Sequence, residues 1–88
     1  MKAPDTRLPY AIRTIPLSDP LGVREDPAFW VFLQGLEGEL GASGRIIVRF
    51  SGIGPENRFF AEAENEQLCE DVITKIEAYL RQRGYLLE

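Results

Sequence analysis

The clearest pattern of apolar positions lies near the end of the chain and predicts a helix. Apolar residues recur there at intervals of three and four, which puts them on one helical face; they are Cys69, Val72, Ile73, Ile76, Tyr79 and Leu80. Asn65 is the expected N-cap and Gly84 the expected stop. Acidic residues near the start, with Arg81 and Arg83 near the end, suit the helix dipole. We expect the tail after Gly84 to pack back onto the domain.

A second helix is predicted to begin at Asp26-Pro27, because Asp caps free amides and Pro suits the first helical position. Its apolar stripe contains Phe29, Leu33, Leu36 and Leu40, with Phe32 beside it, and Gly41 is the expected stop. Gly35 and Gly38 each weaken this helix by about 1 kcal/mol relative to alanine, so packing must hold it together. Trp30 and Val31 widen its apolar surface, and we expect part of that surface to form an exposed patch for another chain.

Three segments alternate with a period of two and predict strands. In residues 9–17, Tyr10, Ile12 and Thr14 point one way and Ala11, Arg13 and Ile15 the other. The prolines at positions 9 and 16 are tolerated only at the ends of a strand or on an edge strand. In residues 45–51 the two faces are Ile46, Val48 and Phe50, and Arg45, Ile47 and Arg49. Residues 58–63 form the third strand, joined to the second as a hairpin. Residues 18–25, which contain Asp19-Pro20 and Gly22, are expected to be a loop.

The order strand, helix, strand, strand, helix indicates an α+β fold, with a small, mainly antiparallel sheet covered on one face by two helices. A chain of 88 residues makes one domain. We expect residues 1–8 to be an N-terminal arm and residues 9–88 to be the domain.

Charge and composition exclude several classes of function. Ten basic and 14 acidic residues give a net charge of −4, which argues against nucleic acid and against an anionic membrane surface as partners. A single cysteine and no histidine exclude an internal disulfide, a Cys/His metal site and a histidine general base. We expect no cofactor. The chain starts without an apolar signal region, and we expect a cytoplasmic protein with Cys69 as a buried structural thiol.

Residues 44–58 carry the chemistry of an anion site. A strand runs into a Ser-Gly-Ile-Gly-Pro loop and leaves through a second arginine, so that Arg49, Ser51, Gly52 and Arg58 can together hold a phosphate. The simpler alternative is a hairpin turn with solvent-exposed arginines. Arg13 and Arg45 either extend the basic face or form surface ion pairs.

The same segment resembles the phosphate-binding loop in the last domain of the α-D-phosphohexomutases, most closely that of the phosphoglucosamine mutases. The family's loop typically reads Gly-Arg-Val-Leu-Val-Arg-Pro-Ser-Gly-Thr-Glu-Pro, followed by two variable residues and Arg. Residues 44–58 here read Gly-Arg-Ile-Ile-Val-Arg-Phe-Ser-Gly-Ile-Gly-Pro-Glu-Asn-Arg. Residues 10–17, 37–41 and 62–64 also resemble the family, so the likeness runs from about residue 8 onward.

In that family the domain closes over the active site, and its loop grips the phosphate of a bound sugar phosphate. By position, the resemblance implies that Arg49, Ser51 and Gly52 contact phosphate and that Arg58 flanks the loop. The chain departs from the family at Phe50, which replaces Pro, and at two loop positions where Ile53 replaces Thr and Gly54 replaces Glu. The change to Ile53 removes a hydrogen-bond donor, and the change to Gly54 removes a carboxylate that could anchor the loop. Ordering the loop on binding is therefore expected to cost more conformational entropy.

The family's phosphorylated serine, magnesium loop and sugar-recognition loop belong to earlier domains and have no counterpart in this sequence. We therefore expect no catalytic residue, no metal site and no activity from this chain alone. Three functions fit: a stand-alone, non-catalytic module that binds phosphate or a phosphosugar; a structural or protein-interaction module with a decayed loop, which binds a partner or a second copy through the first helix; or the C-terminal part of a phosphohexomutase acting with other domains.

Overall fold

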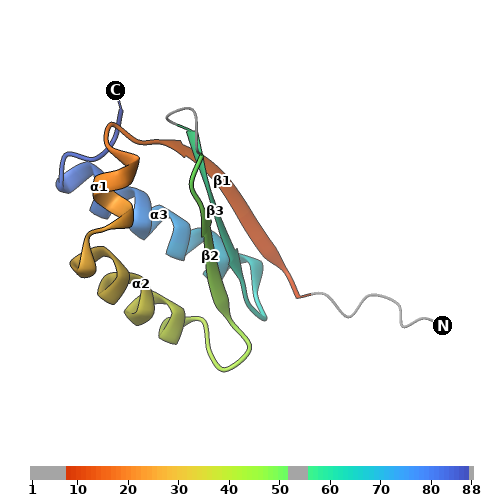
Figure 1. The fold of residues 1–88 in the computed structure, drawn as a ribbon. Coiled ribbons are helices and arrows are strands. Elements are labelled where there is room, and N and C mark those ends of the chain that lie inside the picture. Colours follow the sequence, from red (N-terminus) through yellow and green to blue (C-terminus); the bar gives the residue numbers. More distant parts are fainter. Residues whose placement is uncertain (1–7, 52–55, 88) are drawn as a thin grey trace.

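The computed structural model describes residues 8–51 and 56–87, which form an antiparallel sheet with helices on one face (Figure 1). In chain order the elements are β1 (Tyr10–Pro16), α1 (Pro20–Arg24), α2 (Pro27–Glu39), β2 (Arg45–Arg49), β3 (Glu56–Glu62) and α3 (Glu66–Gln82). The three strands lie in the order β1-β3-β2, so β1 is an edge strand, a position that its prolines allow. The α+β fold is confirmed. Residues 1–7 of the expected N-terminal arm lie outside the described residues.

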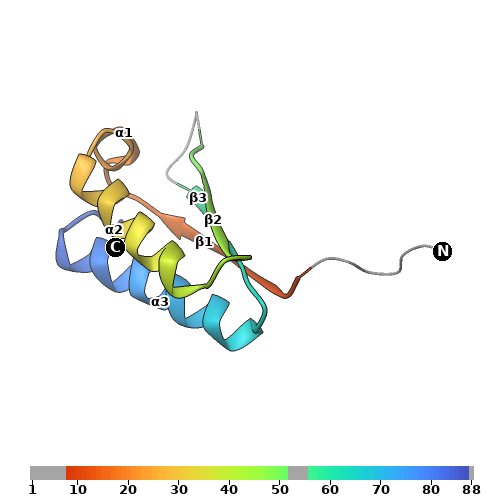
Figure 2. The ribbon, with the colours of Figure 1, turned by 90° about the horizontal axis from the view of Figure 1, so that it is seen from below.

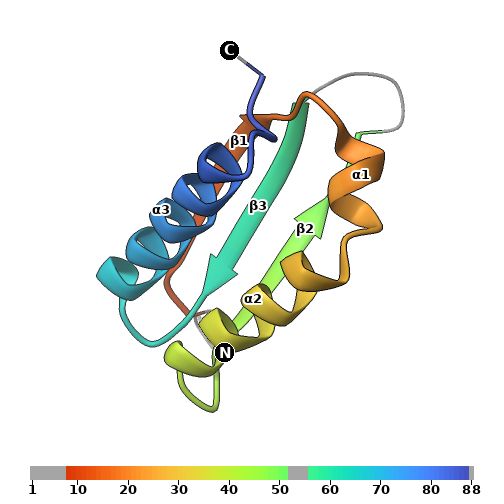
Figure 3. The same cartoon turned by 90° about the vertical axis from the view of Figure 1, so that its left-hand side faces the viewer.

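One face of the sheet packs against the helices. No helix in residues 8–51 and 56–87 covers the opposite face, which we call the bare face. Figures 2 and 3 show α2 and α3 on the same side of the strands, with α3 along β1 and β3 and α2 beside β2. On β3 the buried residues alternate with exposed ones, so that Phe59 and Ala61 point to the helices while Arg58 points away. This alternation determines which side chains reach the bare face.

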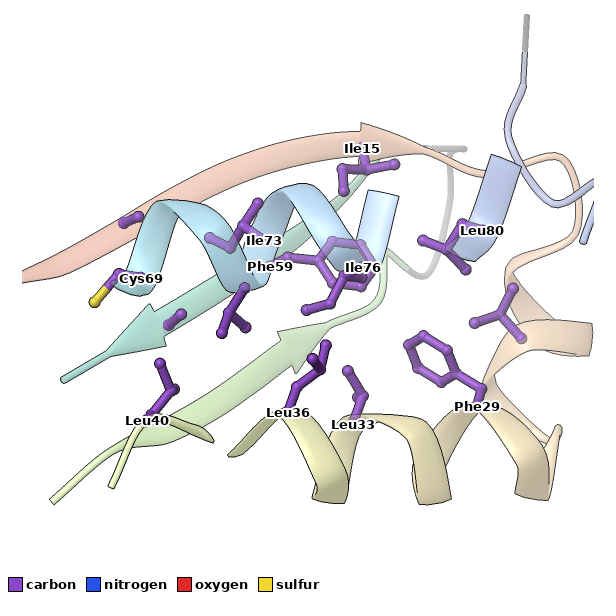
Figure 4. Packing of buried hydrophobic residues seen from close by; sticks show 14 of the residues in the cluster. Ile15, Phe29, Leu33, Leu36, Leu40, Phe59, Cys69, Ile73, Ile76 and Leu80 are labelled. Atoms are coloured by element: carbon purple, nitrogen blue, oxygen red, sulfur yellow. The ribbon is translucent and has the colours of Figure 1, made fainter. Parts of the chain in front are cut away.

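The core lies between the sheet and the two longer helices (Figure 4). Phe59 from the central strand meets Ile73 and Ile76 from α3, and all three side chains are fully buried. The apolar stripe predicted for α2 is also confirmed; its buried members are Phe29, Leu33, Leu36 and Leu40. Cys69 is buried as expected, and burial raises the pKa of its thiol.

The prediction that residues 18–25 form a loop was wrong, because they contain the short helix α1. Asp19 caps it by accepting a hydrogen bond from the backbone N–H of Gly22 at 3.0 Å, and Pro20 occupies its first turn. Its one buried residue, Val23, joins the core. The capping Asp-Pro pair is the signal that correctly located α2, and here it opens a helix of only five residues.

Gly44 leads into β2 at a place with no room for a side chain. A Cβ atom at this position would lie 2.2 Å from the Cβ of the buried Leu40 and 2.9 Å from its carbonyl oxygen. The backbone therefore passes directly over the end of α2, and only glycine permits this approach. This contact fixes where β2 begins relative to α2.

The C-terminal tail packs back, as predicted. Leu86 forms a bridge with Leu17, and the backbone N–H of Ser18 donates to the carbonyl of Tyr85 at 2.7 Å. The Tyr85 hydroxyl donates to Asp26 Oδ2 at 2.9 Å, and Asp26 is the residue that caps α2. The tail therefore links the end of α3 to the start of α2.

The hydrogen bond between Tyr85 and Asp26 should make the stability of the fold depend on pH. The hydrogen bond from Tyr85 is the main cause that lowers the pKa of Asp26 below its ordinary value of 3.8. Because the folded pKa is depressed, the stabilisation is present above pH 3.8 and is lost as the pH falls through the folded pKa. We expect Tyr85→Phe to melt at a lower temperature than the wild type at pH 6, and the difference in melting temperature to narrow as the pH falls below 3.8. A gap that stayed constant to pH 2.5, roughly a unit below ordinary aspartate, would contradict this coupling.

Candidate functional site

The bare face of the sheet is organised in rows that cross the strands. In one row Thr14 on β1 pairs with Arg58 on β3, and Arg58 pairs with Arg49 on β2. Directly opposite residues have Cβ atoms about 4.5–5.5 Å apart, and like charges in such positions destabilise a sheet. The row therefore places two guanidinium groups side by side, where a shared anion would relieve their repulsion.

Neither arginine is neutralised by an ion pair within the described residues. Of the basic residues in 8–51 and 56–87, only three take part in no ion pair; they are Arg24, Arg49 and Arg58. Both Arg49 and Arg58 are exposed, so water solvates them and an incoming anion can reach them.

Arg49, Ser51 and Arg58 line one cavity of about 330 Å³, whose other walls are Thr14, Phe50 and Glu56. Three of the four residues expected to hold phosphate are thus brought together, while Gly52 lies outside the described residues, as do Ile53 and Gly54. Glu56 places a carboxylate on the wall of the same cavity, which opposes an anion and partly offsets the two arginines.

Asn57 positions the start of the loop and was not among the residues predicted for the site. Its Oδ1 accepts a hydrogen bond from the backbone N–H of Ser51 at 2.9 Å, and its Nδ2 donates to the carbonyl of Ile15 at 3.5 Å. Asn57 is 1% exposed. The sequence does carry a signal for this role, because Asn57 is a polar residue on the same strand face as Phe59 and Ala61. The prediction that the strand begins at residue 58 excluded Asn57. β3 begins at Glu56.

Phe50 holds the other side of the loop start. It is partly buried against the core, and its ring lies edge-on to Trp30 with the centroids 6.2 Å apart. Trp30 in turn donates from Nε1 to the carbonyl of Arg24 at 2.7 Å. Phe50, which stands where the family has proline, therefore packs the end of β2 against Trp30 of α2.

The other two arginines considered for a basic face form ion pairs instead. Arg13 points to the helix side, where its guanidinium contacts Glu77 at 2.7 Å and Glu70 at 3.0 Å. Arg45 lies on the bare face and pairs with Glu62 at 2.9 Å. Among residues 8–51 and 56–87, the unpaired positive charge on this face is therefore confined to Arg49 and Arg58.

Residues 8–51 and 56–87 contain no cluster of three or more His, Cys, Asp or Glu side chains able to hold a metal ion. No helix in this described part of the chain has the length and apolar character needed to span a bilayer.

Curated proteins similar to this chain are phosphoglucosamine mutases. The enzyme of Bacillus pumilus is 33% identical over 76 residues, which is 86% of this chain and 17% of that enzyme. The enzyme of Desulforudis audaxviator is 37% identical over 70 residues, which is 80% of this chain and 16% of that enzyme. The chain thus spans about a sixth of the length of the curated relatives it matches. No protein-family model matches it.

Solved structures give the same fold. The N-acetylphosphoglucosamine mutase of Aspergillus fumigatus superposes with a TM-score of 0.72 at 21% identity, over 88% of this chain and 16% of that enzyme. A second structure of that enzyme, in complex with GlcNAc-6P and magnesium, superposes with a TM-score of 0.70.

Proposed function

We propose that this chain, which is related to the phosphoglucosamine mutases, is a non-catalytic module that binds the phosphate group of a small ligand. The observation that carries the proposal is the pairing of Arg49 with Arg58 on the bare face, where neither has an ion pair within residues 8–51 and 56–87. Ser51 lies on the wall of the same cavity.

A phosphate suits this pair better than a single negative charge does. Guanidinium groups present planar N–H donors that match the spacing of phosphate oxygens, and charge-assisted hydrogen bonds are about twice as strong as neutral ones. A dianion also compensates both positive charges at once, which removes the repulsion between cross-strand neighbours. We propose that the ligand is a phosphosugar, because the related Aspergillus fumigatus enzyme was solved in complex with GlcNAc-6P.

Titration with phosphate in a chloride buffer tests this function. We expect inorganic phosphate and glucosamine 6-phosphate at up to about 10 mM to shift the backbone amide signals of residues 49–58. Arg49→Ala and Arg58→Ala should each weaken binding at least tenfold, since a hydrogen bond to a charged group contributes about 1.5–3 kcal/mol.

Arg24→Ala is the matched control, because Arg24 is exposed, has no ion pair among the described residues and lies on α1 rather than on the sheet. It should leave the affinity within about twofold of the wild type. Shifts that are absent at the highest concentration, or equal losses in all three variants, would refute phosphate binding at this site.

A protein-interaction function is the second candidate, because large apolar side chains are exposed on the first two helices. Leu21 is 60% exposed, Val31 66% and Trp30 37%. Sedimentation velocity across a hundredfold range of protein concentration would reveal self-association through this surface. Pull-down with a mutase that lacks its last domain would test whether the chain acts with other domains of such an enzyme.

A further inference from the structure

A second cavity, of about 300 Å³, lies beside the phosphate-site candidate on the same bare face. It shares Arg49 and Arg58 with the first cavity, and its remaining lining residues are Ile12, Arg45, Ile47 and Phe60. One pair of arginines therefore forms a wall common to both cavities.

The floor of this second cavity is apolar. Ile12 pairs with Phe60, and Phe60 pairs with Ile47, so the three side chains form one row across all three strands. A face turned to solvent is normally polar at such positions. Ile12 is 55% exposed, and the Phe60 ring is stacked on Tyr10 with the centroids 5.6 Å apart.

The apolar row and the arginine row are adjacent. Along each strand they are two residues apart, which corresponds to about 7 Å. The group attached to a phosphate held by Arg49 and Arg58 would therefore be within reach of Phe60 and its two neighbours. Arg45, already paired with Glu62, closes the far side of this space.

We propose that the apolar row of Ile12, Ile47 and Phe60 binds the ring of the same ligand whose phosphate is held by the arginines. The ligand class is then a phosphate monoester with an apolar ring face next to the phosphate, bound in preference to inorganic phosphate. This inference rests on the proposed phosphate-binding function. The apolar row would make the site selective for the monoester over inorganic phosphate. The two arginines alone would not, because they contact the same phosphate oxygens in both ligands.

Titrations with phenyl phosphate and with inorganic phosphate separate the two proposals. We expect phenyl phosphate to bind about tenfold more tightly, the gain that corresponds to burying one face of a phenyl ring. Binding of neither ligand would refute the phosphate site and this inference with it. Equal binding of both ligands would leave the phosphate site standing and overturn the role of the apolar row.

A double variant that replaces Ile12 and Ile47 by threonine keeps β-branched residues in both strands while it removes apolar surface. It should abolish most of the tenfold preference and leave the affinity for inorganic phosphate unchanged. Val31→Thr is the matched control, since Val31 is exposed on α2, away from the sheet. A preference that survives in the double variant, with a cooperative melting transition showing that the variant is folded, would overturn the proposal.

Discussion

Phe59→Ala is expected to lower the free energy of unfolding by about 3–5 kcal/mol. Phe59 is fully buried on the central strand, where its ring contacts the face of α3 that carries Ile73 and Ile76 (Figure 4). A domain of this size has a total stability of about 5–10 kcal/mol, so the variant should lose about a third of its stability or more. Urea denaturation followed by circular dichroism measures the loss.

Phe60→Ala is the control for Phe59→Ala, because it removes the same ring from the next residue of the same strand. Phe60 points to the bare face, is half-buried and stacks on Tyr10, so we expect a loss of only about 1 kcal/mol. A one-residue slip of β3 would exchange the two faces of the strand. Equal losses in the two variants would therefore contradict the register described here.

Asn57→Leu should lower both stability and phosphate affinity. Leucine keeps the number and branching of side-chain heavy atoms but removes the acceptor that Asn57 Oδ1 provides to the backbone N–H of Ser51. Loss of this hydrogen bond at a part-buried donor should cost about 0.5–1.5 kcal/mol. Loss of this anchor should also let the start of the loop move, and we expect phosphate binding to weaken at least threefold. Urea denaturation and the phosphate titration give the two readouts.

Glu56→Leu introduces the same residue one position earlier, on the exposed side of the strand. It should change stability by less than about 0.5 kcal/mol. It should not weaken phosphate binding, because it removes a negative charge from the cavity wall. If Asn57→Leu unfolds at the same urea concentration as the wild type, the Ser51 amide is satisfied without Asn57 and the anchoring role is wrong.

The helices and the alternation of the strands could be predicted from the sequence because they depend on local patterns. The stripe from Cys69 to Leu80 has a single helical period, and it located α3 correctly. Residues 18–25 were misread because Asp19-Pro20 and Gly22 are typical both of turns and of a capped helical turn. Packing of Val23 into the core decides between these alternatives, and that contact cannot be read from the segment itself.

The candidate site was predictable only in part, for a similar reason. Alternation along β2 placed Arg45 and Arg49 on one face, and this is what the structure shows. The contacts of Arg13 with Glu70 and Glu77 join positions 57 and 64 residues apart, so no local pattern indicated them. The contribution of Asn57 likewise depends on a neighbour, Ile15, that lies 42 residues away.

β3 occupies the middle of the sheet although it is the last of the three strands in the chain. Its pairing with β2 joins residues close in the sequence, such as Arg49 and Arg58. Its pairing with β1 joins distant residues, from Pro16 with Glu56 to Tyr10 with Glu62. Half of the sheet therefore requires closure of a loop of about 40 residues or more, an entropic cost met before any contact compensates it. During synthesis β1 emerges before its partners β3 and α3 exist, so its apolar face stays exposed until both have left the ribosome.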